Sequence, residues 1–322
     1  MRVGILTSGG DAPGMNACIR AFVRIGLGHG LRIVGIYGGF QGILDENLGD
    51  LDSRSVAHII HRGGTILTTG RSEEFKTEEG LKKAARVLQE HDIQALVAIG
   101  GDGTMRGLTA LEKYWPGQTI GIPGSIDNDI WGTDYSIGFD TAVNNALDAI
   151  DKIRDTAEAF SRVFLVEVMG RKCGAIGAHV GIASGASAVA IPETKTDLKV
   201  IADKIAEGRL RGKSSAIVIV AEGDDEGNAA AIGEKLNGLL PGEKTRISVL
   251  GYIQRGGNPT RQDRILATRL GVYAVDCILE GVRGVMLGEV RGNLVKTPYE
   301  DTWKKKKSLD KWMLDLIGDL AT

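Results

Sequence analysis

Short hydrophobic runs alternate with longer amphipathic stretches along the chain. The runs, which predict β-strands, are Val3–Thr7, Arg32–Tyr37, Ala95–Ile99, Thr119–Ile122, Val163–Val168, Ala188–Ile191, Ala216–Val220, Ser248–Leu250 and Val285–Glu289. The stretches between them that predict helices are Asn16–Leu27, Thr77–Glu90, Ala142–Thr156, Leu198–Arg209, Asn228–Leu239 and Asp263–Glu280. Continuously hydrophobic strands are typical of parallel sheets that helices cover on both faces. The pattern therefore predicts an α/β fold.

Glycine and polar residues are concentrated directly after the predicted strands. Four of these turns read SGGDAPGMN, GGDGT, PGSIDND and MGRKCG. Ligands of open parallel sheets bind beyond the carboxyl ends of the strands, where backbone N–H groups and helix N-termini converge. The second half of the chain repeats this strand-then-glycine design, and 322 residues exceed the usual size of a single core. We therefore expect two similar domains with a ligand site.

Charge and cysteine content narrow the class of partner. The 39 basic and 41 acidic residues give a formal net charge of −2, which disfavours nucleic acid or a membrane surface. Because no hydrophobic run approaches membrane-spanning length and Met1 leads directly into a strand, we expect a cytoplasmic protein without a signal peptide. Cys18, Cys173 and Cys277 lack the spacing of a disulfide framework or zinc site. The expected partners are small molecules.

The first glycine-rich turn, within Thr7–Arg20, allows two interpretations. Its missing side chains would let a phosphate group approach the backbone, or the turn is simply tight, with Asp11 or Asn16 capping the following helix. The turn matches neither GxGxxG nor GxxxxGK[ST], so the common dinucleotide and Walker-type sites are disfavoured.

The GGDGT turn adds a carboxylate, Asp102, to such a loop. A carboxylate facing a triphosphate is repelled unless a divalent cation lies between them, so Asp102 is a candidate Mg²⁺ ligand. The alternative is that Asp102 caps the next helix through the N–H of Thr104 or Met105.

The PGSIDND loop carries Asp127 and Asp129 on either side of Asn128, with the hydroxyl of Ser125 nearby. One carboxylate could accept the proton of an attacking hydroxyl while the other helps to hold a metal or a neighbouring cation. The alternative is a turn rich in Asp and Asn with a surface acidic pair.

Five arginines at loops or strand ends could grip phosphate with a planar guanidinium, although each taken singly is typical of a solvated surface. They are Arg71, Arg162, Arg171, Arg246 and Arg255.

Taken together and in this order, SGGDAPGMN, GGDGT, PGSIDND, GTDYSIGFDTA, VEVMGR and LGYIQRGGNPT closely resemble the bacterial 6-phosphofructokinases, over roughly residues 2–292. The resemblance implies transfer of the γ-phosphoryl group of MgATP to the 1-hydroxyl of fructose 6-phosphate. It further implies two Rossmann-like three-layer α/β/α domains with mostly parallel sheets, an active site in the cleft between them, and a homotetramer.

The resemblance also implies roles for particular residues. Asp127 would be the general base, Arg171 would stabilise the transferred phosphoryl group, and Asp129 would help fix the cation-rich surroundings. ATP would be held by Gly10, Arg71, Ser72, Gly101, Asp102, Gly103 and Thr104, with Asp102 on Mg²⁺. The sugar phosphate would be bound by Ser125, Asp127, Arg162, Met169, Gly170, Arg171, Glu222, Arg246, Tyr252 and Arg255, of which Arg162 and Arg246 would reach the site of a neighbouring subunit.

Two glycines indicate the phosphoryl donor. Pyrophosphate-dependent relatives typically carry Asp where this chain has Gly103 and Lys where it has Gly124. The carboxylate would take the space and the charge environment of the α-phosphate of a nucleotide. The resemblance thus implies ATP.

The chain departs from the family at several positions. Ser125 replaces a Thr and keeps the hydroxyl, whereas Tyr252 replaces a His, which exchanges an imidazole for a neutral phenol and should weaken sugar-phosphate binding by about 1.5–3 kcal/mol. Lys172 and Cys173 replace His and Ala beside Arg171.

The family's effector site binds ADP or phosphoenolpyruvate between subunits. Its basic residues match Arg20, Arg24, Arg154, Arg211 and Lys213. Ser187 stands where the family has a glutamate, so one anchor for the Mg²⁺ of ADP is lost and we expect a blunted allosteric response.

We expect the larger, ATP-binding domain to comprise residues 1–138 and 252–299, and the smaller, sugar-phosphate domain to comprise residues 139–251 and 300–322. Three other functions are alternatives: a pyrophosphate-dependent phosphofructokinase, a nicotinamide dehydrogenase suggested by the α/β pattern alone, and a non-catalytic sugar-phosphate sensor. Gly103 and Gly124 disfavour the first, the missing GxGxxG the second, and the complete set Asp102, Asp127, Asp129 and Arg171 the third.

Overall fold

The computed structural model describes residues 1–319, which divide into two compact units. Unit 1 comprises Met1–Ile126, Ile130–Thr141 and Arg255–Lys307, and unit 2 comprises Asp127–Asp129, Ala142–Gln254 and the residues from Ser308 onward. Residues 300–307, which we expected in the smaller domain, lie in unit 1, because α10 (Asp301–Lys304) contacts helix α4 and strand β11 of that unit.

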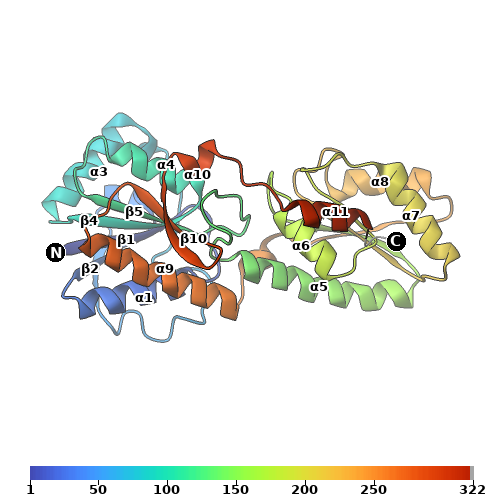
Figure 1. The fold of residues 1–322 in the computed structure, drawn as a ribbon, viewed down its shortest axis with the longest axis horizontal. Coiled ribbons are helices and arrows are strands. Elements are labelled where there is room, and N and C mark those ends of the chain that lie inside the picture. Colours follow the sequence, from blue (N-terminus) through green and yellow to red (C-terminus); the bar gives the residue numbers. More distant parts are fainter. Residues whose placement is uncertain (320–322) are drawn as a thin grey trace. The chain divides into compact units, whose positions relative to one another are not determined.

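Unit 1 is built on a seven-stranded sheet with the order β11-β10-β5-β4-β1-β2-β3 (Figure 1). The strands are β1 Arg2–Ser8, β2 Arg32–Ile36, β3 Leu48–Leu51, β4 Ala95–Gly100, β5 Gln118–Pro123, β10 Val285–Val290 and β11 Asn293–Pro298. Only the edge strands β3 and β11 run antiparallel to their neighbours. The hydrophobic pattern missed both of them, because only one residue of each is buried.

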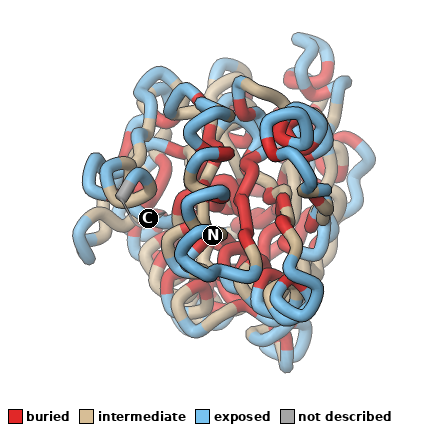
Figure 2. Tube along the Cα trace, turned by 90° about the vertical axis from the view of Figure 1, so that its right-hand side faces the viewer, coloured by how far each residue is buried: buried red, intermediate tan, exposed pale blue. Residues whose placement is uncertain are grey.

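Helices cover both faces of this sheet. They are α1 Met15–Gly28, α2 Phe40–Leu44, α3 Glu78–Glu90, α4 Asp102–Leu111, α9 Arg261–Leu279 and α10, with the 3-10 turn η1 Glu74–Lys76. Helices α1 and α9 pack together on one face, while α3 and α4 cover the other (Figure 1). A buried cluster including Leu6, Leu88 and Trp115 fills the space between the sheet and the α3–α4 layer. Figure 2 shows the buried residues in red.

Unit 2 contains a four-stranded, fully parallel sheet with the order β7-β8-β6-β9. Its strands are β6 Val163–Val168, β7 Ala188–Ala190, β8 Ala216–Ala221 and β9 Arg246–Val249. Its helices are α5 Phe139–Ala159, which begins in unit 1, then α6 Ala175–Ala183, α7 Leu198–Leu210, α8 Ala229–Leu239 and α11 Lys311–Asp319, with the 3-10 turn η2 Gly251–Arg255. Helices α7 and α8 bury one face of the sheet, and α6 with α11 covers the other.

The predicted α/β class is confirmed, since helices flank mostly parallel sheets in both units. The predicted strand Ser248–Leu250 was shifted: β9 runs from Arg246 to Val249, pairs only with β6, and exposes Ile247 and Val249. Edge strands of this kind lack the continuous hydrophobic pattern that marks buried ones. In residues 1–319, no helix combines the length and apolar character needed to cross a membrane.

Two kinds of helix start matter for the site. Helices α3, α7, α8 and α9 begin at Thr77, Asp197, Asn228 and Thr260, whose side chains accept hydrogen bonds from first-turn N–H groups, as N-caps usually do. Helices α1, α4 and α6 instead begin at Gly14, Gly101 and Gly174, which have no side chain to cap with. These three helices follow the glycine-rich turns, and no side chain of the N-cap residue occupies their first-turn N–H groups.

Candidate active site

The register of the unit 1 sheet brings three of the glycine-rich turns to one edge. Ser8, the last residue of β1, pairs with Gly100 of β4, and Gly100 pairs with Pro123 of β5. The turns that follow these strands therefore start side by side. Strand β1 has β2 on one side and β4 on the other, so the turns lie at the point where the strand order reverses, the usual ligand site of such sheets.

The turn after β1 is tied to the segment 62–70. The side-chain amide of Asn16 donates to the carbonyls of Arg62 and Gly63 and accepts from the N–H of Ile66. The N–H of Gly9 donates to Gly70 O (3.3 Å). Asn16 thus holds a neighbouring loop, and α1 has its N-cap at Gly14, so the helix-cap interpretation of Asp11 or Asn16 is wrong.

Gly10 and Arg255 meet over this turn. A Cβ on Gly10 would lie 2.6 Å from Nη1 of Arg255, and the same nitrogen donates to Asp11 O (3.1 Å). A side chain at position 10 would displace the guanidinium, so this close approach needs glycine there; the bond from Arg255 to Asp11 joins residues 244 apart in the sequence.

Asp102 is the first residue of α4, and its half-exposed carboxylate pairs with Nε of Arg106 (3.5 Å). Within residues 1–319 no side chain caps α4, so Asp102 does not play the predicted alternative role of a cap. Gly101 and Gly103 stand in open space, where a built Cβ would meet no described heavy atom within 4 Å. Thr104 is buried, and its hydroxyl donates to Ser8 O (3.4 Å).

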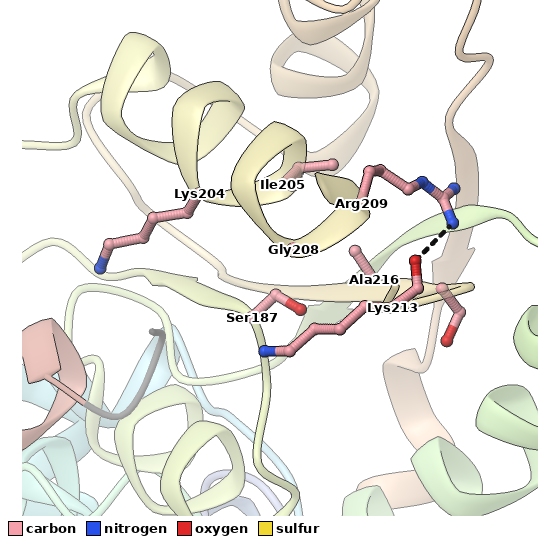
Figure 3. Close-up of a pocket in the computed structure, with 8 residues that line it drawn as sticks. Ser187, Lys204, Ile205, Gly208, Arg209, Lys213 and Ala216 are labelled. Atoms are coloured by element: carbon pink, nitrogen blue, oxygen red, sulfur yellow. Dashed lines mark hydrogen bonds between the residues drawn. The ribbon is translucent and has the colours of Figure 1, made fainter. Parts of the chain in front are cut away.

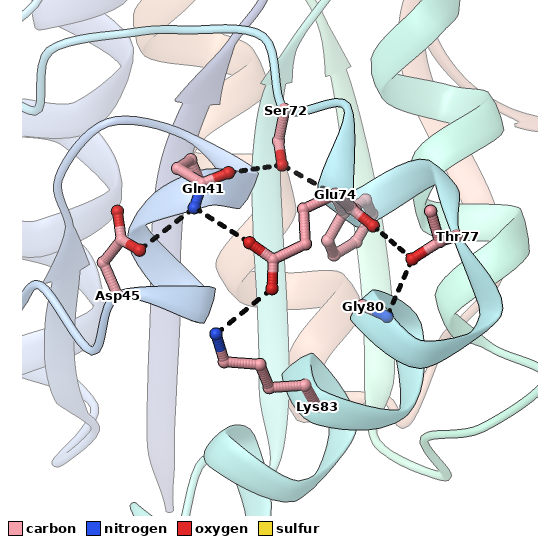
Figure 4. A network of polar contacts seen from close by, with 8 residues as sticks. Gln41, Asp45, Ser72, Glu74, Thr77, Gly80 and Lys83 are labelled. Atoms are coloured by element: carbon pink, nitrogen blue, oxygen red, sulfur yellow. Dashed lines mark hydrogen bonds and ion pairs between the residues drawn. The ribbon is translucent and has the colours of Figure 1, made fainter.

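Arg71 and Ser72 continue from the segment that Gly9 contacts. Arg71 is exposed, whereas the hydroxyl of Ser72 donates to Oε1 of Gln41 (2.6 Å) and accepts from the N–H of Phe75 (3.0 Å). Figure 4 shows how Gln41 in turn donates to Asp45 and Glu74, and how Lys83 binds Glu74. Ser72 is therefore positioned by a network on α2, η1 and α3.

Ser125 follows β5 in the same row of turns. Its N–H donates to Ile137 O (3.1 Å), and its carbonyl accepts from the hydroxyl of Ser136 (2.5 Å). A Cβ on the preceding Gly124 would lie 2.9 Å from Cε of Met15, so a side chain there requires Met15 to move.

Unit 2 contains the acidic loop Asp127–Asp129. Asp127 is 2% exposed, and its Oδ2 lies 3.3 Å from Nε of Arg171, whose own side chain is half-exposed. Asn128 between the two acids has a φ of 54°, a left-handed conformation in which Asn is among the better-tolerated residues. The loop is thus no surface acidic pair: Asp127 is buried beside a guanidinium.

The turn between β6 and α6 presents Arg171. Gly170 and Arg171 both have positive φ, 144° and 53°, so the backbone leaves the usual regions where it exposes the arginine. The N–H of Arg171 donates to Oε2 of Glu222 (3.1 Å), and that of Met169 to Oε1 of Gln254 (3.4 Å). Strand pairing of Val168 with Ala221 places the two turns, 169–174 and 222–228, side by side.

Three further predicted sugar-phosphate residues lie partly or largely at the surface of unit 2. The guanidinium of Arg162 stacks on the ring of Phe160 (4.5 Å), Arg246 begins the edge strand β9, and Tyr252 on η2 is 83% exposed. Such surface positions are compatible with side chains that contact another subunit.

The predicted effector residues are divided between the units. Arg20 and Arg24 lie on α1 of unit 1, whereas Arg154 on α5 donates to Ser184 O in unit 2. Arg211 pairs with Glu207 (3.4 Å). Figure 3 shows Ser187 and Lys213 lining a pocket of ≈ 10 Å³, room for about one water.

The sequence analysis missed two residues of this region, Gln254 and Glu193. Gln254 is fully buried and holds the N–H of Met169, and both oxygens of Glu193 accept from the N–H of Gly174. Glu193 lies outside the glycine-rich turns, whereas Gln254 lies within the motif LGYIQRGGNPT but was assigned no role there. For Glu193 the available clue was a carboxylate shortly after a predicted strand.

Comparisons with known proteins extend over the whole chain. A family model described as Phosphofructokinase matches residues 2–278. Among curated proteins, the ATP-dependent 6-phosphofructokinase 1 of Thermus thermophilus is 51% identical over 320 residues, which cover 99% of each chain.

Solved structures share the fold. Phosphofructokinase from Saccharomyces cerevisiae superposes with a TM-score of 0.89 at 33% identity; the match covers 99% of this chain but 47% of the yeast chain, so this protein spans about half of that relative's length. The pyrophosphate-dependent phosphofructokinase of Marinobacter aquaeolei, at 22% identity and a TM-score of 0.84, shows the likeness of fold alone. Its match covers 100% of this chain and 92% of the other. The family model and the Thermus relative agree with the motifs at the sheet edges, and the chain belongs to the phosphofructokinase family.

Proposed function

We propose that this protein transfers the γ-phosphoryl group of ATP to the 1-hydroxyl of fructose 6-phosphate, giving fructose 1,6-bisphosphate and ADP. The observation that carries the proposal is the buried carboxylate of Asp127 with Nε of Arg171 3.3 Å away, in a chain 51% identical to an enzyme named ATP-dependent 6-phosphofructokinase. A base and a guanidinium side by side are what phosphoryl transfer to an alcohol requires from a protein.

Asp127 is the proposed general base. As the sugar O1 attacks the γ-phosphorus, its proton passes to a carboxylate oxygen of Asp127, and the bond from phosphorus to the bridging oxygen of ADP breaks. The ion pair with Arg171 fixes the direction of the carboxylate before the sugar arrives, and such positioning supplies much of the rate enhancement in this reaction class. Arg171 neutralises the charge on the transferred phosphoryl oxygens.

Unit 1 supplies the proposed nucleotide site. Gly101 and Gly103 leave the backbone open to phosphate groups, Gly10 lies against the guanidinium of Arg255, and α1 and α4 begin at glycines whose N-termini favour anions. Arg71 and Ser72 come from the adjoining segment, and Thr104 fixes the α4 turn against β1. With glycine at 103 and 124, the site has neither the carboxylate nor the lysine expected for a pyrophosphate donor.

Mg²⁺ is proposed to bind with the nucleotide. Residues 1–319 contain no group of three or more His, Cys, Asp or Glu side chains able to hold a metal by themselves. A single carboxylate, Asp102, at an open helix start still fits this ion, because Mg²⁺ commonly binds through one or two carboxylates together with substrate phosphates and water. When bound, the ion would neutralise phosphate charge. Asp129, beside Asp127, is proposed to help fix the cations of the site.

The sugar phosphate is proposed to contact Ser125, Met169, Gly170, Glu222, Tyr252 and Arg255, with Arg162 and Arg246 acting in the site of a neighbouring subunit. The partial exposure of Arg162 and Arg246 supports contacts beyond a single chain, and Tyr252 is 83% exposed. The proposal therefore includes a homotetramer in the cytoplasm, with ADP or phosphoenolpyruvate as candidate effectors at Arg20, Arg24, Arg154, Arg211 and Lys213.

A coupled assay of fructose 1,6-bisphosphate formation tests the function. The wild type should turn over with ATP and Mg²⁺ and not with pyrophosphate, and Asp127→Ser should lower kcat by about 10³-fold with KM values near those of the wild type. Asp148→Ser, at an exposed carboxylate on α5, is the matched control and should keep the wild-type rate.

Several outcomes would contradict the proposal. Turnover with pyrophosphate alone would identify the other donor. Binding of both substrates without any bisphosphate formed would favour the non-catalytic sensor. An Asp127→Ser variant as fast as the wild type would remove the base assignment.

A further inference from the structure

The turn between β6 and α6, Met169–Gly174, is held by side chains from three other segments of unit 2. Each side chain accepts a hydrogen bond from a backbone N–H of the turn: Gln254 from Met169 (3.4 Å), Glu222 from Arg171 (3.1 Å), and Glu193 from Gly174 (2.8 Å to Oε1 and 3.0 Å to Oε2). Glu193 binds the end of the turn, where it becomes helix α6.

Gly174 makes the contact with Glu193 possible. A Cβ at position 174 would lie 2.3 Å from Oε2 of Glu193 and 2.7 Å from Cβ of Ile191, so no other residue fits between the turn and this carboxylate. Helix α6 has Gly174 as its N-cap and no acidic residue in its first turn. Glu193 therefore supplies, from outside the helix, both the acceptor and the negative charge that a helix N-terminus favours.

The turn needs such support because its backbone is strained. Arg171 has a φ of 53°, a conformation that costs free energy for a residue with a side chain. On its other side the carbonyl of Arg171 packs against Gly223, where an added Cβ would lie 2.2 Å from Arg171 O. Strain of this kind persists only where the surroundings fix the chain on several sides.

We propose that Glu193 is a positioning residue for phosphoryl transfer: by holding Gly174 N–H, it keeps the strained turn in the form that places Arg171 beside Asp127. Glu193 touches neither Arg171 nor Asp127 in the described hydrogen bonds and acts through the short segment that joins Arg171 to Gly174. This inference rests on the proposed function, because it assigns Glu193 a part in the work of Arg171.

The proposal predicts a selective kinetic defect. The proposed ATP residues lie in unit 1, whereas Glu193 and its partners lie in unit 2. Releasing the turn should therefore lower kcat and leave the KM for ATP unchanged. Misplacing a catalytic group by about 1 Å can cost on the order of 10²-fold, and we expect a fall of about 10- to 30-fold, because Gln254 and Glu222 still hold the turn.

Three variants test this. Glu193→Asp keeps the charge but shortens the side chain by one methylene, so it should lose the bond to Gly174 and lower kcat by about 10-fold. Glu193→Gln keeps an acceptor at the same reach and should stay within about 3-fold of the wild type. Asp197→Ala is the matched control: it removes a carboxylate from the N-terminus of α7, outside the turn, and should leave kcat unchanged.

A double-mutant cycle with Arg171→Ala measures whether the two residues act together on kcat. A purely structural role of Glu193 would give no such coupling. If Glu193 acts through Arg171, Glu193→Asp should cost nothing further in the Arg171→Ala background. The inference is overturned by a Glu193→Asp variant with wild-type kcat, by equal losses in both backgrounds, or by the same loss in Asp197→Ala. An inactive wild type would instead overturn the proposed function. Removal of the whole side chain in Glu193→Ala could prevent folding. Glu193→Asp retains the charge and most of the side chain's volume, so it is the variant used for the test.

Discussion

The two units present opposite chemistry at equivalent places in similar sheets. In unit 1, Gly101 and Gly103 after β4 have open space beside them, and the helices after β1 and β4 begin at glycines. In unit 2 the turn after β6 also contains glycine, but its left-handed backbone serves to expose a charged side chain, Arg171. One edge offers backbone N–H groups, and the other offers side chains.

Under the proposed function, the two sheet edges would bind different parts of the substrates. A backbone edge without side chains lets a chain of phosphate groups approach many N–H donors at once. A guanidinium and a carboxylate at fixed distance act on a single reacting bond, but they must be held rigidly to do so. In unit 2, Gln254, Glu222 and Glu193 accept hydrogen bonds from the backbone of the turn. In unit 1, a Cβ added at Gly101 or Gly103 would meet no described atom within 4 Å.

The largest expected effect comes from removing the side chain that defines the unit 2 edge. Arg171→Ala should lower kcat by about 10²- to 10³-fold, because charge on the transferred phosphoryl group would then lack its guanidinium. Arg86→Ala, an exposed arginine on α3 paired with Glu90, should have no effect. Steady-state kinetics at saturating ATP measure both. A loss confined to KM would mean that Arg171 only binds substrate.

Asp263 of unit 1 can be compared with Asp127 of unit 2, because both carboxylates are buried. Asp263 binds the backbone at a helix start, whereas Asp127 lies beside a guanidinium. Asp263 is 1% exposed and accepts hydrogen bonds from Gly138 N (2.8 Å), Thr141 N (2.8 Å) and Thr141 Oγ1 (2.5 Å) at the start of α5. Burial raises the pKa of Asp263 from 3.8 to about 6. The folded state thus binds the proton of the Asp263 carboxyl more tightly than the unfolded chain does. Protonation of Asp263 therefore stabilises the folded state fully below pH 3.8, and this stabilisation is lost as the pH rises through about 6.

Asp263→Asn should lower the free energy of unfolding by about 2 kcal/mol, since an amide cannot accept all of these bonds. The difference in the free energy of unfolding between wild type and variant should be largest at low pH and should become smaller as the pH rises through about 6. Urea unfolding over a pH series measures this, with Asp276→Asn, exposed on the same helix, as the control. A difference that stays constant with pH would show that the titration of Asp263 is not linked to folding.

Gly103→Asp tests the unit 1 edge. A Cβ added at position 103 would meet no described atom within 4 Å, so the free energy of unfolding should be unchanged. The new carboxylate should repel the nucleotide phosphates and lower kcat/KM for ATP by about 30-fold. Gly103→Asn adds similar bulk without charge and should cost less. If ATP kinetics do not change, the α4 turn does not face the nucleotide.

The smallest expected effect is a gain. Tyr252→His should lower the KM for fructose 6-phosphate by about 3- to 10-fold, because a charged imidazole replaces a neutral phenol. The gain should be smaller than the value of about 1.5–3 kcal/mol for a full charge-assisted bond, since solvent screens a contact at an 83% exposed position. The KM for ATP should not change. Tyr135→His, in unit 1, serves as the control, and an equal effect in both variants would point to surface charge in general.

The hydrophobic pattern predicted the long, buried elements well, and its errors have physical causes. Helix α6 is apolar all round, because its neighbours are the sheet on one side and α11 on another, so it has no 3.6-residue periodicity to detect. Helices α2 and α10 are too short for a period to be detected, and the edge strands β3 and β11 bury one residue each. The capping alternatives for Asp11, Asn16 and Asp102 could not be settled until the glycine N-caps were seen.

The candidate site divides in the same way. The sequence by itself determined the α/β class and marked Asp127, Arg171 and the glycine-rich turns as candidates, because strand hydrophobicity and glycine-rich turns are local properties of the chain. Only the tertiary structure decided which of them meet: Ser8 with Gly100 and Pro123 through strand register, Asp127 with Arg171, and Glu193 with Gly174. Such contacts depend on strand order and packing, which join segments that no local pattern links.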